Sequence, residues 1–290
     1  MKECIACAEE IKPNAKLCKH CGVQQNDPTY ISFEKFDSVE TLWDSTEALE
    51  ASFASNVARK LFAKKTKSAD IILRLAGDDD VGVRAEVADN ERTPEAVQKQ
   101  LAKDPEDLVR MIIAQRQEMP EGVESLMVKD EDDMVRGLLA ENLGTSPEIL
   151  AELARDDEDS VREAVAGNPN TPEKVLRLLA SDDAWMVRLR VAENPNSSSG
   201  VLSSLLQDGV VAVRSAIGQN HNASYESLKM LISSSSDNFE TEVLWEVALN
   251  NSADVDLISH VIRNLLTLED SGYTEPNNGD EEQFSLNSLL

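Results

Sequence analysis

The stretch DDEDSVREAVAGNPNTPEKVL, residues 156–176, contains a Val-Arg pair that returns along the chain at a constant step of 26 residues. An aspartate stands six residues before each of these arginines, and a branched aliphatic residue followed by a small one begins three residues after it. The arginines are Arg84, Arg110, Arg136, Arg162, Arg188 and Arg214, and the aspartates are Asp78, Asp104, Asp130, Asp156, Asp182 and Asp208. A fixed period of this length predicts a repeat protein whose units stack on one another.

One repeat is predicted to form two short helices. In NTPEKVLRLLASD, residues 170–182, Thr171 can cap a helix, and Pro172 suits its first position. The acidic run after residue 155 is expected to cap the next helix, DSVREAVAGN, which Asn168 would end in a left-handed conformation. Because 26 residues leave little room for two full helices, one of each pair could be a short 3₁₀ turn.

Faded copies of the repeat flank the regular series. One begins at Val57, and another begins at Val243 after a four-residue insertion rich in serine. The sequence therefore predicts an all-α fold, a right-handed solenoid of about eight two-helix repeats over residues 57–268. Stacking would bring the Asp and Arg positions into a ladder, in which each arginine bridges carboxylates of its own and an adjacent repeat. Since packing demands such regularity, we interpret the ladder as structural and seek function where the pattern breaks.

The pattern LA.DD...VR..VA.NPNTPE.VL..LA resembles the leucine-rich repeat variant, a bacterial repeat of alternating α and 3₁₀ helices. It is more distantly similar to HEAT repeats, which share the Asp-to-Arg ladder. The resemblance covers about 70 per cent of the chain and implies a scaffold, since such repeats mostly serve as scaffolds. The family's repeat is usually about two residues shorter than this one.

Residues 4–22 near the start of the chain read CIACAEEIKPNAKLCKHCG, in which the spacing of the cysteines is C-x2-C-x10-C-x2-C. Four thiolates in two such pairs can hold one tetrahedral Zn²⁺, and about twenty residues need a metal to fold because they cannot bury a core. The motif resembles the short zinc ribbons found at the start of many bacterial proteins. A mononuclear iron centre or an iron–sulfur cluster could use the same four ligands, whereas a disulfide framework is disfavoured by the absence of other cysteines. The ligands are Cys4, Cys7, Cys18 and Cys21.

The sequence between and after these modules predicts three smaller segments. We expect the zinc ribbon over residues 1–23. After it come a linker over 24–33 and an amphipathic helix over 34–56 that caps the first repeat. The repeats then run over 57–268, and an acidic tail, expected to be disordered, follows over 269–290.

Composition narrows the classes of partner. The 290 residues carry a net charge of −26, and the acidic loops would repel phosphate backbones. No apolar run approaches the length of a membrane span, so we expect a cytoplasmic protein that does not bind membranes. The exception is RKLFAKKTK, residues 59–67, whose basic side chains could contact nucleic acid or an acidic protein, although a solvated face is the simpler interpretation.

The repeat pattern breaks at two places. Trp185 stands where other repeats carry an acid, and Arg190 follows nearby; tryptophan and arginine are frequent interface anchors. In the second regular repeat, Arg116 takes the position of a recurrent asparagine and is followed by Met119. These four residues are the candidate partner-binding residues.

No arrangement of residues points to an enzyme, because the three histidines are scattered and no nucleophile motif or phosphate-binding loop is present. The leading hypothesis is a non-catalytic scaffold that binds another protein through the solenoid, with the ribbon as a second contact. The alternative is a zinc-dependent adaptor or regulator that binds nucleic acid through the ribbon and residues 59–67.

Overall fold

The computed structural model of the protein describes residues 2–3, 10–11, 44, 46, 55–120, 122–234, 241–250 and 252–270. Two short strands, β1 (Lys2–Glu3) and β2 (Glu10–Ile11), pair in antiparallel fashion with Lys2 opposite Ile11. The described residues from 55 onward contain sixteen helices. They are α3 (Asn56–Lys65), α4 (Ala69–Leu75), α5 (Val81–Asp89), α6 (Glu95–Leu101), α7 (Asp107–Ala114), α8 (Val123–Met127), α9 (Asp133–Glu141), α10 (Pro147–Leu153), α11 (Asp159–Gly167), α12 (Glu173–Leu179), α13 (Trp185–Glu193), α14 (Ser199–Ser204), α15 (Val211–Gln219), α16 (Tyr225–Ser234), α17 (Thr241–Leu249) and α18 (Val255–Asp270).

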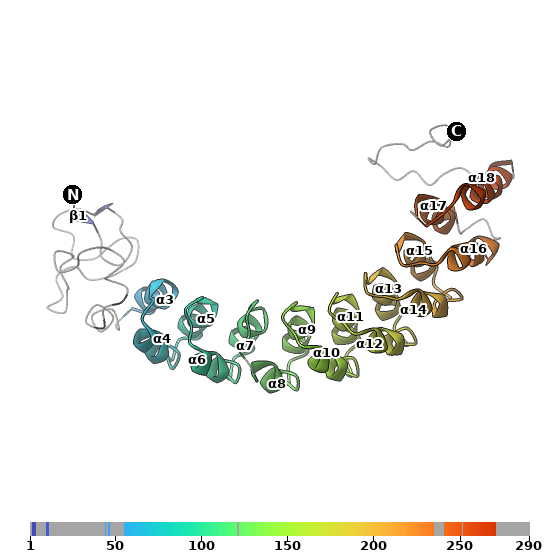
Figure 1. Cartoon of the computed structure of the whole chain (residues 1–290). Coiled ribbons are helices and arrows are strands. Elements are labelled where there is room, and N and C mark those ends of the chain that lie inside the picture. The colour runs from blue at the N-terminus through green and yellow to red at the C-terminus, as the bar shows by residue number, and fades with distance from the viewer. Residues whose placement is uncertain are drawn as a thin grey trace. The chain divides into compact units, whose positions relative to one another are not determined.

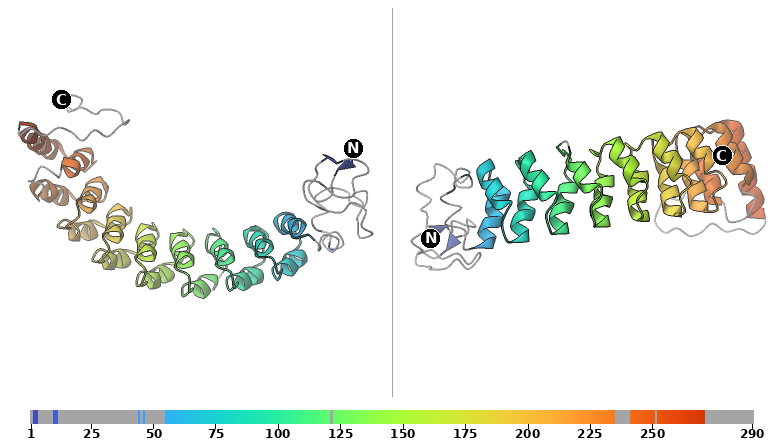
Figure 2. Two further views of the ribbon diagram at one scale, coloured as in Figure 1. Left: turned by 180° about the vertical axis from the view of Figure 1, so that it is seen from behind. Right: turned by 90° about the horizontal axis from the view of Figure 1, so that it is seen from below.

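The helices form two compact units, an N-terminal unit (Met1–Val175) and a C-terminal unit (Leu176–Leu290). Within each unit, odd-numbered helices stack in a first row and even-numbered helices in a second row, as Figures 1 and 2 show. The first row of the N-terminal unit is α3, α5, α7, α9 and α11, and that of the C-terminal unit is α13, α15 and α17. These pairs confirm the predicted all-α solenoid of eight two-helix repeats.

The prediction of a 3₁₀ turn in each pair was wrong. No 3₁₀ helix occurs among the described residues, and the second-row helices from α4 to α14 are short α-helices, whereas α16 and α18 are longer. For example, α8 has five residues, and α4, α6 and α10 have seven each. The 26-residue repeat therefore accommodates two helices by shortening the second one.

The core lies between the two rows and uses the residues that define the repeat. The valine of each Val-Arg pair and the aliphatic residue four positions later face inward together, because residues i and i+4 share one side of a helix. Val83 and Val87 on α5, and Val135 and Leu139 on α9, are fully buried. The second row adds residues such as Leu150 and Leu153 of α10. A repeat buries this face only by stacking, which explains why successive repeats pack on one another within each unit.

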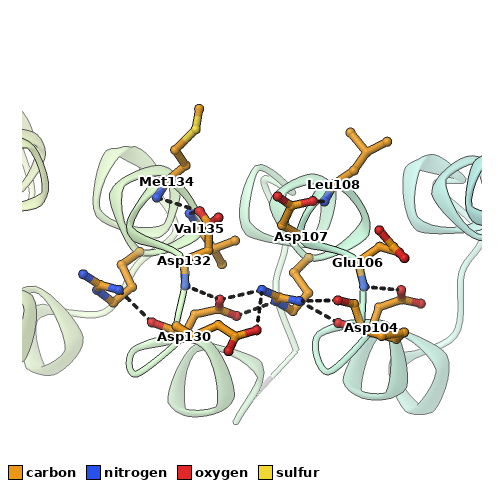
Figure 3. A network of polar contacts seen from close by, with 12 residues as sticks. Asp104, Glu106, Asp107, Leu108, Asp130, Asp132, Met134 and Val135 are labelled. Carbon is orange, nitrogen blue, oxygen red and sulfur yellow. Dashed lines mark hydrogen bonds and ion pairs between the residues drawn. The ribbon is translucent and has the colours of Figure 1, made fainter.

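The acidic runs cap some first-row helices but not all. Asp80 accepts a hydrogen bond from the backbone N–H of Val83 (3.1 Å) at the start of α5. Asp132 accepts bonds from Met134 (2.9 Å) and Val135 (3.2 Å) at the start of α9, as Figure 3 shows. At α11, Glu158 occupies the N-cap position without such a bond, so the capping predicted there was wrong. The negative charge of Asp159, in the first turn of α11, still stabilises the helix because it lies near the positive end of the helix dipole.

Candidate protein-binding surface

Four of the ladder arginines, Arg84, Arg110, Arg136 and Arg188, each join two neighbouring repeats through the guanidinium group. The Nε of Arg110 donates to Oδ2 of Asp130 (2.7 Å), and its Nη2 donates to Oδ1 (2.9 Å). Its Nη1 donates to the backbone carbonyl of Asp104 in its own repeat (2.8 Å). Figure 3 shows Asp104 and Asp130 on either side of this contact. The same pattern recurs at Arg84 with Asp104, Arg136 with Asp156 and Arg188 with Asp208.

The ladder differs from the expectation in how each arginine contacts its own repeat. Arg110 reaches the backbone carbonyl of Asp104, and not its carboxylate. That carboxylate is already occupied, because it accepts bonds from Arg84 of the preceding repeat and from the backbone N–H of Glu106 (3.0 Å). Asp104 therefore binds the preceding arginine and the turn that leads into its own first-row helix, and Asp130 and Asp156 do the same.

The ladder is buried, and its charges neutralise one another inside the stack. The side chains of Arg110 and Asp130 are only 7% and 6% exposed. The hydrogen bond to Asp130 raises the pKa of Arg110, because it favours the charged guanidinium. Burial alone would raise the pKa of Asp156, but hydrogen bonds from Arg136 and the backbone N–H of Glu158 hold that pKa below its ordinary value. The ladder groups thus stay ionised and hold repeats together.

Sequence reasoning missed one member of the ladder. Arg59 of α3 donates from Nε to Oδ2 of Asp78 (2.6 Å) and from Nη2 to Oδ1 (3.0 Å), which is the ladder geometry. It stands 25 residues before Arg84, one short of the regular step, so the constant spacing did not reveal it. An Arg that precedes an acidic run by about twenty residues was the available signal.

The basic segment 59–67 is largely paired with carboxylates of the following repeat. Besides the Arg59 contact, Lys60 pairs with Asp80 (3.0 Å) and Lys64 lies 3.5 Å from Glu86. Lys65 and Lys67 are exposed. Much of the positive charge that could attract phosphate is therefore compensated within the protein itself.

A second ladder, built from asparagines, lies at the other end of the first-row helices. Asn168 donates from Nδ2 to the backbone carbonyls of Ala140 (2.7 Å) and Asn142 (3.0 Å) in the preceding repeat, and its Oδ1 accepts from the N–H of Asn170 (2.8 Å). Asn90, Asn142, Asn220 and Asn250 bond in the same way.

These contacts overturn the left-handed helix end predicted for Asn168. Its backbone is extended, with φ −70° and ψ 121°, because its side chain satisfies carbonyls of the neighbouring repeat. Thr171 does not act as a helix cap either: its hydroxyl is buried and donates to the backbone carbonyl of Val165 (2.6 Å).

Arg116 replaces the asparagine in this second ladder. Its Nη1 donates to the carbonyls of Ala88 (2.6 Å) and Asn90 (3.1 Å), which stand 28 and 26 residues earlier, the same offsets as for Asn168. Burial lowers the pKa of Arg116, and its Nε is buried without a hydrogen-bond partner. The neighbouring candidate Met119 is half-buried. It holds the position in its repeat that Thr171 holds two repeats later. The structure thus places this pair at an inter-repeat junction.

Trp185 and Arg190 both lie on α13 in the C-terminal unit. Trp185 is the first residue of the helix and is 44% exposed. Arg190 is exposed, and its Nη1 lies 3.0 Å from a carboxylate oxygen of Glu193. Met186, at 43% exposure, is four residues before Arg190 and so shares its side of the helix.

Sequence reasoning also missed two exposed apolar residues in the N-terminal unit. Leu108 on α7 and Met134 on α9 are 48% and 59% exposed and project from the same side of neighbouring helices (Figure 3). Both stand directly before the valine of a Val-Arg pair, at the position that Met186 holds on α13. That shared position was the signal available in the sequence.

The predicted metal ligands, Cys4, Cys7, Cys18 and Cys21, lie outside the described residues. The strands β1 and β2 are separated by six residues that include Cys4 and Cys7, and their pairing brings together the chain on both sides of the first C-x2-C pair. Among the residues that the structure describes, no cluster of three or more His, Cys, Asp or Glu side chains could hold a metal ion. None of the helices in this described part is long and apolar enough to cross a membrane.

Comparison with known proteins supports the architecture. Residues 160–184 match the family model described as "Leucine rich repeat variant". The chain is also similar to a solved structure described as "a leucine-rich repeat variant with a novel repetitive protein structural motif", with 23% identity and a TM-score of 0.52. That match covers 79% of this chain and 88% of the other. No curated protein matches. At this level of identity the likeness shows the fold, a solenoid of stacked helix pairs.

Proposed function

We propose that this protein is a non-catalytic scaffold that binds another protein through the exposed side of its first-row helices. A repeat solenoid is suited to this role because its stability comes from neighbouring repeats and leaves one long surface available for binding. In the described repeats, the ladder acids and arginines pair with one another, so they support the array and leave recognition to other side chains.

The observation that carries the proposal is the apolar start of α13. Trp185 and Met186 expose 44% and 43% of their surfaces, where a tryptophan can anchor a partner. The corresponding first residues of α7, α9 and α11 are Asp107, Asp133 and Asp159.

Stability of α13 does not account for Trp185. An acid in the first turn of a helix contributes roughly 0.3–1 kcal/mol through the helix dipole, and α13 has none. Its N-cap residue, Ala184, makes no capping side-chain bond. The helix therefore forgoes two common sources of stability at the place where it exposes a tryptophan, which favours a role in binding.

Affinity capture from the native cell extract, read by mass spectrometry with and without nuclease, tests the proposal. The wild-type chain is compared with a Trp185→Ala/Arg190→Ala variant and with a Met230→Ala/Arg263→Ala control, whose residues are exposed on α16 and α18. A defined protein that is captured despite nuclease, retained by the control and lost in the first variant is the expected result. The proposal would be overturned if capture disappears after nuclease treatment and is unchanged in the Trp185→Ala/Arg190→Ala variant.

The alternative function is a nucleic-acid adaptor that acts through the ribbon and residues 59–67. The exposed Lys65 and Lys67 favour it, whereas the pairs of Lys60 with Asp80 and Lys64 with Glu86 disfavour it. Salt-sensitive binding to DNA or RNA that is lost on Lys60→Ala/Lys64→Ala/Lys65→Ala would establish this alternative.

We further propose that the four cysteines hold a structural Zn²⁺ and that the resulting ribbon provides a second contact for the partner. A closed set of four thiolates suits zinc and leaves no open coordination position for catalysis. The antiparallel pairing of β1 with β2 on either side of the first cysteine pair supports a compact module at this end.

A further inference from the structure

Two neighbouring helices of the N-terminal unit carry an apolar surface that faces solvent. On α7, Leu108 is followed by Met111 and Ile112 at i+3 and i+4, so the three share one side of the helix. On α9, Met134 and Leu138 are related by i+4 in the same way. Leu108 and Met134 are exposed, and the other three are half-buried. We call these five residues the α7–α9 apolar face.

The α7–α9 apolar face is not needed to build the repeat. The core positions of these two helices, Val109 with Ile113 and Val135 with Leu139, are fully buried on the opposite side. The adjacent first-row helices, α5 and α11, form the same fold without this surface. At the position of Leu108 and Met134 they carry Gly82 and Ser160. At the position of Met111 they carry Ala85 and Glu163. An exposed apolar surface that the helices on either side lack is not required by the repeat, and it indicates binding rather than architecture.

Gly137 in the middle of α9 gives independent support. A side chain built there would meet nothing within 4 Å, so packing inside the protein does not require a glycine. At Gly218 on α15, by contrast, a Cβ would come within 3.0 Å of the Cβ of Glu246. Glycine inside a helix costs about 1 kcal/mol relative to alanine. The open glycine between Met134 and Leu138 therefore leaves room for the close approach of a partner.

The charges around this face define the partner's chemistry. Glu106, Asp107, Glu131 and Asp133 are exposed at the N-terminal ends of α7 and α9, and Glu141 is exposed at the other end of α9. The arginines of these helices, Arg110 and Arg136, are bound to Asp130 and Asp156 in the ladder. Of the exposed carboxylates, Arg110 also lies 3.8 Å from that of Glu131, whose side chain is 89% exposed. A segment that covers the apolar face must therefore lie among exposed negative charges.

We propose that the α7–α9 apolar face binds a cationic amphipathic helix of a partner protein, with its apolar side on Leu108, Met134 and Leu138 and its Lys or Arg residues toward the surrounding carboxylates. This inference rests on the proposed scaffold function and specifies the chemistry of one partner segment. A methionine-rich apolar surface with an acidic border is suited to such helices.

Two other occupants conflict with the charges. A second copy of the chain would bring another net charge of −26 to the acidic border. The chain's own tail ends in apolar residues, but residues 269–290 contain Glu269, Asp270, Glu275, Asp280, Glu281 and Glu282 and no Lys or Arg.

A synthetic peptide of leucine and lysine at helical spacing, about eighteen residues long, is a suitable probe. Binding to the full chain is measured by calorimetry, beside a peptide with glutamate in place of lysine and one with serine in place of leucine. Of the three peptides, only the leucine–lysine peptide should bind well. The Leu108→Ser/Met134→Ser variant should lower the affinity for this peptide by about tenfold or more, as expected when interface anchors are removed. Leu73→Ser is the matched control, because Leu73 is 57% exposed on the second-row helix α4. Equal affinities for the double variant and this control would overturn the inference.

Gly137→Ala separates binding from folding. The added methyl group favours the helix and should raise the unfolding temperature. It should also lower the affinity for the peptide, because it fills the space that the glycine leaves open. A variant that is more stable and binds the peptide as tightly as the wild type would also overturn the inference. If the Trp185 variant loses its captured protein while Leu108→Ser/Met134→Ser retains both protein and peptide, the scaffold function stands and only this site fails.

Discussion

Arg116 and Asn142 make the same inter-repeat contacts one repeat apart. Arg116 donates from Nη1 to the backbone carbonyls of Ala88 and Asn90, and Asn142 donates from Nδ2 to those of Ala114 and Arg116. The longer side chain compensates for a shorter helix, since α7 ends at Ala114 whereas α9 continues to the residue before Asn142. A repeat that looks divergent in sequence thus keeps the contacts that join it to its neighbour.

Replacing Arg116 with alanine should therefore destabilise the repeat array. Two carbonyls would lose a donor, at a cost of about 1–3 kcal/mol. Arg92→Ala is the control, because Arg92 is exposed, and surface changes of this kind usually alter stability by less than about 0.5 kcal/mol. Urea denaturation followed by circular dichroism measures both. If Arg116→Ala destabilises the protein no more than Arg92→Ala does, and the variant no longer captures the partner protein, Arg116 is a binding residue instead.

Removing one arginine from the buried ladder should cost more. Arg110→Ala leaves the Asp130 carboxylate, 6% exposed, without its partner, and breaking a buried ion pair typically costs about 3–5 kcal/mol. Lys129→Ala, which breaks a pair with Glu152 whose side chains are 82% and 46% exposed, should cost no more than about 1 kcal/mol. Unfolding of Arg110→Ala/Asp130→Ala should show a loss smaller than the sum of the single variants. Similar losses for Arg110→Ala and Lys129→Ala would refute the structural interpretation of the ladder.

Asp80 should make stability depend on pH in the acidic range. Hydrogen bonds from Asn56 and Lys60 lower its pKa from the ordinary value of 3.8 to about 2. A group with a lowered folded-state pKa contributes fully above its unfolded value and loses its contribution as pH falls through the folded value. The stability difference between wild type and Asp80→Asn should thus be constant above about pH 5 and shrink between pH 3.8 and about 2.

The comparison with Asp80→Asn isolates this group, because both chains share the change in overall charge on acidification. Asparagine also retains the ability to cap α5, where Asp80 accepts from the N–H of Val83. Asp79→Asn, at an exposed neighbouring position, is the control. Denaturation curves at several pH values measure the difference, and a gap between wild type and Asp80→Asn that persists unchanged to pH 2 would contradict the expectation.

The repeat could be predicted from sequence because each repeat presents the same packing problem. Even the four-residue insertion before Val243 leaves these contacts intact: Asn250 donates to the carbonyls of Gly218 and Asn220, 32 and 30 residues earlier, where Asn168 uses offsets of 28 and 26. The role of Asn168 could not be predicted, since local preference favours a left-handed helix end, and contacts with another repeat decide otherwise.

The α7–α9 apolar face escaped prediction for a related reason. The α7 sequence DLVRMIIA is apolar on more than one side, so helical periodicity does not separate Val109, which is buried, from Leu108, which is exposed. Only the stacking of neighbouring repeats determines which side is covered. Candidate binding residues in repeat proteins are therefore best sought by comparing equivalent positions in successive repeats.

The cysteine motif predicts one zinc ion per chain, bound independently of the repeats. Elemental analysis should find zinc in the wild type and a loss of it in Cys18→Ser/Cys21→Ser, since the closed site needs all four thiolates. Iron in the purified protein would instead support the iron or iron–sulfur site. Chelation should leave the cooperative unfolding of the repeats nearly unchanged, because their stability is a sum over neighbouring repeats and Cys4, Cys7, Cys18 and Cys21 all lie outside residues 57–268. A large drop in helix stability on chelation would instead show that the ribbon packs on the first repeat and is part of the same folding unit.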